Sequence, residues 1–95
     1  MQAAKVAGAS RSKGRSYLVK AVWDGEAGVW VATSDDVPGL VTEAANVDAL
    51  IKKLRVLIPE LLDANGRIPR RNGKPLAEVP FEVVAEYHER LRLDS

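Results

Sequence analysis

The sequence predicts an α+β domain with the element order β-β-β-α-β, in which one amphipathic helix covers one face of a mainly antiparallel sheet. Three observations predict this fold: a pair of β-branched and aromatic runs around a glycine-bounded loop, a Pro-Gly pair before a short apolar run, and a long stretch with helical apolar spacing. We expect residues 17–95 to form this single domain and residues 1–16 to form a disordered basic tail.

The first two strands are predicted as a hairpin. Tyr17–Asp24 (YLVKAVWD) and Val29–Ser34 (VWVATS) are rich in β-branched and aromatic residues. The four residues between them, Gly25–Gly28, begin and end with glycine, which is typical of a hairpin loop. Both faces of this hairpin are largely apolar, so we expect a helix to cover one and a second subunit to cover the other.

The hairpin sets a register between the two strands. If Asp24 pairs with Val29, then Trp23 lies opposite Trp30. We expect the two tryptophans to pack as a cross-strand pair, in the core or at an oligomer interface. Stacking of the pair on a ligand is the alternative.

A turn and a short third strand follow. Val37 precedes proline and is therefore pushed towards an extended conformation. Pro38-Gly39 suits the two central positions of a type II turn, because proline presets φ and glycine accepts a positive φ. We expect Leu40–Ala44 to be the third strand.

The helix is predicted from Val47, with Asn46 as its N-cap and Asn65-Gly66 as its C-terminal stop. Pro59 removes one backbone donor, so it should kink the helix or divide it into two segments. Apolar side chains recur every three or four residues, at Val47, Leu50, Ile51, Leu54, Leu57, Ile58, Leu61 and Leu62.

The last part of the chain is predicted as a basic loop and a strand. Residues 66–78 are rich in glycine, proline and basic side chains, with Asn72-Gly73 as a tight turn. Val79–Leu91 alternates in part between apolar and polar side chains, which indicates a long final strand with Pro80 near its start. A helix is the alternative, because alanine, glutamate and leucine favour helices.

The sequence lacks the residues and motifs that are typical of several function classes. The sequence has no cysteine and one histidine, His88, so we expect no zinc site, thiol nucleophile or histidine-based catalysis. A glycine-rich phosphate loop is also missing, and we expect no cofactor. We find no apolar run of about 18 residues and no signal-peptide pattern, so we expect a cytoplasmic protein.

The net charge of +1 hides a segregation of charge. Residues 16–65 carry four basic and eight acidic side chains, a net charge of −4, and residues 76–95 carry a net charge of −3. Residues 66–75 carry four basic side chains and no acidic one. An acidic body disfavours nucleic acid as the main ligand and favours a basic protein partner.

The run WDGEAGVWVATSDDVPGLVTEA, followed by NVDALIKKLRVLIPELLDAN, resembles the short HicB-related family of uncharacterised bacterial domains. The resemblance implies a reduced ribonuclease-H-like fold and binding of a small basic toxin ribonuclease. It also implies a homo-oligomer, a dimer or a tetramer. Many HicB proteins carry a C-terminal DNA-binding domain, for which we expect no room after Leu91.

The leading hypothesis is therefore a non-catalytic, HicB-like antitoxin or a stand-alone relative, with no enzyme activity. Its acidic and aromatic surface would meet the toxin through Glu26, Asp35, Asp36, Trp23 and Trp30.

Two alternatives remain. A nucleic-acid-binding regulator would use the basic tail and Arg67, Arg70, Arg71 and Lys74. A more remote alternative is a metal-dependent nuclease, whose carboxylates would come from Asp24, Glu26, Asp35, Asp36 and Glu43.

Overall fold

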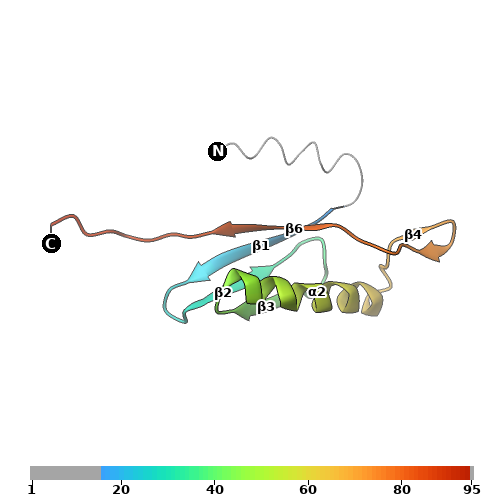
Figure 1. Ribbon diagram of the computed structural model, residues 1–95, viewed down its shortest axis with the longest axis horizontal. Helices are drawn as coiled ribbons and strands as arrows, with labels where there is room; N and C mark the ends of the chain where they lie inside the picture. Colours follow the sequence, from blue (N-terminus) through green and yellow to red (C-terminus); the bar gives the residue numbers. More distant parts are fainter. Residues whose placement is uncertain (1–15, 95) are drawn as a thin grey trace.

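The computed structural model describes residues 16–94. Its elements are β1 (Tyr17–Asp24), β2 (Val29–Thr33), β3 (Val41–Ala44), α2 (Val47–Ala64), β4 (Arg70–Arg71), β5 (Lys74–Pro75) and β6 (Phe81–Glu86). Four strands form one sheet in the order β3-β2-β1-β6, with α2 on one face (Figure 1). The β1–β2 and β2–β3 pairs are antiparallel and the β1–β6 pair is parallel. The α+β class is confirmed, and the basic tail lies outside the described residues except for Ser16.

The β1–β2 hairpin has the predicted register. Trp23 pairs with Trp30, and Asp24 pairs with Val29. The backbone N–H of Gly28 donates to the carbonyl of Asp24 at 2.8 Å, and Gly28 has a φ of 70°, which favours glycine. β2 ends at Thr33, one residue earlier than predicted.

The Pro-Gly turn also forms as predicted. The N–H of Leu40 donates to the carbonyl of Val37 at 3.1 Å, and Gly39 has a φ of 84°, the value that a type II turn requires at this position. A side chain at Gly39 would be strained and would lie 3.6 Å from Leu61 of the helix. The turn therefore brings the chain close to α2.

α2 is a single helix whose ends match the prediction. The side chain of Asn46 accepts a hydrogen bond from the N–H of Ala49 at 2.8 Å, and the helix ends at Ala64. The helix continues through Pro59 and is not divided there. Pro59 and Arg55 are both exposed, so water can satisfy the carbonyl of Arg55 that loses its helical partner.

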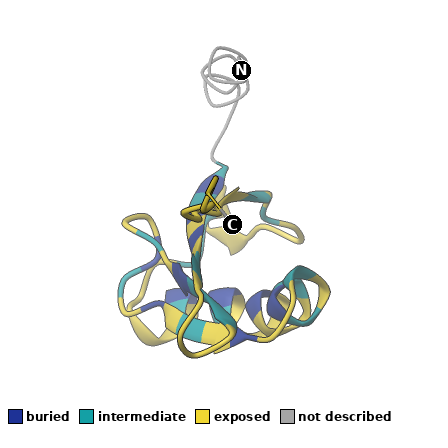
Figure 2. Cartoon of the chain, turned by 90° about the vertical axis from the view of Figure 1, so that its left-hand side faces the viewer, coloured by how far each residue is buried: buried dark blue, intermediate teal, exposed yellow. Residues whose placement is uncertain are grey.

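The core lies between α2 and the sheet, where the buried residues gather (Figure 2). The helix contributes one row of buried side chains at a spacing of four residues: Leu50, Leu54, Ile58 and Leu62. The sheet and the turn contribute the rest: Tyr17, Val19, Ala21, Ala32, Val37, Leu40 and Ala44. The opposite face of the sheet is open, since Val41 is 71% exposed.

Two predictions for the last third of the chain are wrong in detail. The predicted strand Val79–Leu91 is shorter, because its parallel pairing runs only from Tyr17–Phe81 to Val22–Glu86 and β1 turns away soon afterwards. The predicted basic loop contains a small hairpin, β4–β5, around Asn72-Gly73. Both turn residues have positive φ, 55° and 79°, as in a type I′ turn.

We predict that Leu54→Ala lowers the free energy of unfolding by about 2–5 kcal/mol, because Leu54 is fully buried and its loss leaves a cavity. The matched control is Val56→Ala on the same helix, which should change it by less than about 0.5 kcal/mol, because Val56 is 57% exposed. Urea unfolding followed by circular dichroism measures both values. Equal losses would contradict the assignment of the buried row.

Candidate protein-interaction site

Three aromatic side chains meet at one end of the sheet. The rings of Trp23 and Trp30 have centroids 5.4 Å apart, and Tyr87 lies 6.2 Å from Trp23 and 6.4 Å from Trp30. The tryptophans are half-buried and Tyr87 is 57% exposed. We name these three residues the aromatic cluster. Aromatic rings that are fixed on one side and exposed on the other are the usual anchors of protein interfaces.

Tyr87 was not among the predicted site residues. It follows β6, and the parallel register that pairs Val22 with Glu86 brings the next residue of each strand, Trp23 and Tyr87, together. Its hydroxyl donates a hydrogen bond to Glu89 Oε1 at 2.8 Å. This bond, together with the negative charge of Glu89, raises the pKa of Tyr87 above its ordinary value, so the phenol stays neutral.

The aromatic cluster adjoins an acidic loop. Asp24 Oδ1 accepts hydrogen bonds from the N–H groups of Glu26 and Ala27, at 3.1 and 3.2 Å, and so shapes the turn. Glu26 is exposed, and it contributes its backbone N–H but not its carboxylate to the hydrogen bonds of this turn.

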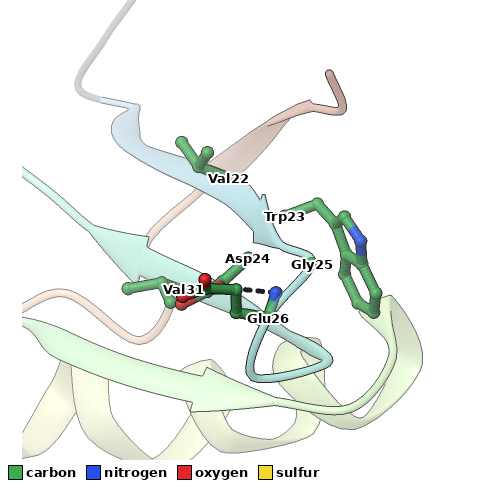
Figure 3. A pocket seen from close by; sticks show the side chains of 6 residues that line it. All are labelled: Val22, Trp23, Asp24, Gly25, Glu26 and Val31. Carbon is green, nitrogen blue, oxygen red and sulfur yellow. Dashed lines mark hydrogen bonds between the residues drawn. The ribbon is translucent and has the colours of Figure 1, made fainter. Parts of the chain in front are cut away.

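An open depression of about 680 Å³ surrounds this end of the hairpin, lined by Val22, Trp23, Asp24, Gly25, Glu26 and Val31. Trp23 lies on one side of β1, while Asp24, Glu26 and Val31 gather on the other (Figure 3). The depression therefore joins the apolar side chains of Val22 and Val31 to two carboxylates, which suits a partner with basic and apolar side chains.

The other two predicted acidic residues lie elsewhere. Asp36 Oδ2 accepts a hydrogen bond from the N–H of Leu18 at 2.7 Å, and Ser34 Oγ donates to the carbonyl of Leu18 at 2.6 Å. The carboxylate of Asp36 therefore fixes the start of β1 through the backbone of Leu18. Leu18 and Trp23 stand five residues apart on this strand, which separates the two acidic surfaces by about 17 Å. The predicted partner residues thus form two sites instead of one.

Asp35 is exposed at this second site. A shallow hollow beside it is lined by Leu18, Lys20, Thr33, Ser34, Asp35 and Asp36. Asp36 also lines a hollow shared with Arg67 and Arg70. Because basic side chains adjoin this corner, its negative potential is weaker than that of the loop at Glu26.

Three of the four predicted basic residues lie on the β4–β5 hairpin and Arg67 lies just before it; the hairpin projects at the far end of the domain from the β1–β2 loop (Figure 1). Arg67, Arg70, Arg71 and Lys74 are all exposed. Arg70 Nη1 donates to the carbonyl of Gly73 at 3.1 Å, which ties this side chain to the turn. The hairpin is thus an ordered basic projection, where the sequence predicted a loop.

The carboxylates of the nuclease alternative do not converge. Asp24 and Glu26 lie at one end of β1, and Asp35 and Asp36 lie near its other end. Within residues 16–94, no three histidine or acidic side chains lie close enough to hold a metal ion. His88 is exposed, with Nε2 3.8 Å from Glu86 Oε1. No helix in this range is long and apolar enough to span a membrane.

Comparisons with known proteins place the chain in a family. Residues 16–95 match a family described as a domain of unknown function, DUF1902. The chain belongs to this family. A similar crystal structure is that of the hypothetical protein TTHA1013 from the extremely thermophilic bacterium Thermus thermophilus, which is 49% identical. The match covers 83% of this chain and 100% of that chain, with a TM-score of 0.60. No curated protein matches the chain.

This result confirms the broader part of the resemblance, an uncharacterised domain family. Neither comparison names HicB, so the relation of this DUF1902 domain to HicB stays a prediction.

We predict that Asp36→Ala lowers the free energy of unfolding by about 1.5–3 kcal/mol, because it removes a charged acceptor from the N–H of Leu18. The adjacent Asp35→Ala, an exposed residue with the same charge, should change it by less than about 0.5 kcal/mol. Urea unfolding of the two variants measures the difference. If Asp36→Ala left the free energy of unfolding unchanged, the structural role of Asp36 would be contradicted and a binding role would be favoured.

Proposed function

We propose that this DUF1902 domain is a non-catalytic protein-binding module that recognises a small basic protein. The observation that carries the proposal is the aromatic cluster of Trp23, Trp30 and Tyr87 next to the acidic loop at Asp24 and Glu26. The rings supply apolar anchors, and the carboxylates supply long-range attraction and register for basic side chains.

The resemblance to HicB narrows this partner to a toxin ribonuclease. In this version the domain is an antitoxin, or a stand-alone relative, that covers the catalytic face of the toxin and acts as a homo-oligomer. The net charge of −4 over residues 16–65 supports attraction to such a protein.

The decisive experiment uses a small basic protein encoded beside the gene for this domain. We expect the two proteins to co-purify as a complex and the domain to inhibit RNA cleavage by that protein. Absence of a complex at micromolar concentrations would overturn the antitoxin version of the proposal.

We predict that Glu26→Lys slows association with that basic protein roughly three- to tenfold at low salt, with a smaller effect at high salt, because Glu26 is an exposed rim charge. The matched control is Glu60→Lys, the same change of charge on the exposed side of α2. Stopped-flow tryptophan fluorescence measures the rates. Similar slowing by both variants would show that only the net charge matters.

A second candidate function is nucleic-acid binding through the β4–β5 hairpin, favoured by its three exposed basic side chains and by Arg67 just before it. We predict that any binding to a labelled RNA or DNA duplex falls steeply with salt and is lost in the combined Arg67→Ala, Arg71→Ala and Lys74→Ala variant. Arg70 is kept because it supports the turn. Fluorescence anisotropy is the measurement, and binding that survives in the variant would refute this mechanism.

A further inference from the structure

Within residues 16–94, the outer edge of β6 has no strand partner. β6 is the last strand of the sheet, and β1 occupies only one of its edges. The N–H of Tyr17 donates to the carbonyl of Pro80 at 2.9 Å, so the even-numbered residues of β6 direct their backbone groups to β1. The odd-numbered residues therefore present N–H and C=O groups to the open edge. Such an edge pairs readily with another strand.

The alternating pattern continues beyond β6 into residues 87–94, which we name the arm. The pairing with β1 ends at Glu86, before the arm begins. In this arm Leu91 is 75% exposed and Leu93 is 90% exposed, which is unusual for leucine. Apolar and polar side chains alternate over most of residues 81–94. The odd positions are mostly apolar: Phe81, Val83, Ala85, Tyr87, Leu91 and Leu93, with Glu89 as the exception. The even positions are mostly polar: Glu82, Glu86, His88, Arg90, Arg92 and Asp94, with Val84 as the exception.

We propose that this edge and arm pair antiparallel with the same segment of a second copy of the chain, in a register centred on Tyr87. In that register three apolar pairs form across the twofold axis, Phe81 with Leu93, Val83 with Leu91, and Tyr87 with itself, while Ala85 faces Glu89. The charged side chains also match, as Glu82 faces Arg92 and Glu86 faces His88. The two four-stranded sheets then join into one.

Two neighbouring registers also place the apolar side chains of both copies on the same face of the sheet, but they bring like charges together. A register centred on residue 86 places Glu86 opposite its own copy. One centred on residue 88 places Glu82 opposite Asp94. Like charges directly opposite each other destabilise strand pairs, so the register centred on Tyr87 is preferred.

The surface next to the open edge of β6 also suits a second copy of the chain. A hollow of about 320 Å³ lies between α2 and the chain entering β6, with Leu54, Ile58, Val79 and Phe81 among its lining residues. The proposed register brings Leu93 of the second copy next to Phe81, on the face of the sheet that carries this hollow. An apolar side chain that is 90% exposed in one copy thus gains a partly apolar site on the other.

The proposal concerns self-association, and it does not depend on a basic protein partner. Pairing at the edge brings the two aromatic clusters together at the Tyr87 pair. Glu82 and Arg92 lie outside the aromatic cluster, so variants at these two positions change self-association separately from partner binding.

Light scattering and analytical ultracentrifugation of the full chain test the charge pairing. We expect a particle of twice 10.3 kDa at micromolar concentration. Glu82→Arg and Arg92→Glu should each weaken the dimer about tenfold, because symmetry makes each change act at two sites. The double variant should restore the affinity. Matched controls are Glu60→Arg and Lys52→Glu on the exposed side of α2, outside the hollow beside Phe81, which should have no effect.

Single-cysteine variants test the register, since the chain contains no cysteine. Tyr87→Cys should form an intermolecular disulfide on mild oxidation, because residues facing each other in a hydrogen-bonded pair have Cα atoms about 5.5 Å apart. Glu89→Cys should not, because its copy lies about 13 Å away in this register. A monomer at all concentrations, a dimer unaffected by the charge variants, or cross-linking by Glu89→Cys but not Tyr87→Cys would overturn the proposal.

Discussion

The pairing of β1 along both of its edges determines where the other features of this domain lie. Its antiparallel register with β2 brings Trp23 opposite Trp30, and its parallel register with β6 brings Tyr87 beside them. Its inward side chains, Tyr17, Val19 and Ala21, are three of the five core residues that the sheet contributes. A shift of either register by one residue would turn these side chains to the open face, so the core and the aromatic cluster depend on the same pairing.

Local patterns in the sequence predicted the elements whose geometry is local. The hairpin loop, the Pro38-Gly39 turn and the Asn46 cap each depend on residues within a few positions of one another, and all three form as expected. The parallel position of β6 could not be predicted in this way. It depends on pairing between residues more than sixty positions apart, and so the place of Tyr87 in the cluster could not be foreseen.

The length of the last strand shows a related limit. Alternation extends to Leu93, and the sequence therefore predicted a long strand, yet β6 ends at Glu86 because β1 offers no further partner. A strand pattern reports the face of a side chain and does not report whether a neighbouring strand is present. Alternation without a neighbour inside the chain is the signal that points to a strand from outside it.

The acidic residues show why residue type alone does not identify a binding site. Asp24 and Asp36 have the same carboxylate as Glu26 and Asp35, but they accept backbone hydrogen bonds and serve the turn and the start of β1. The corner at Asp36 also lies beside Arg67 and Arg70. The loop at Glu26 adjoins no basic side chain in the depression that it lines. Because an unbalanced charge attracts over a longer range than a balanced one, a basic partner should approach the aromatic end of the sheet.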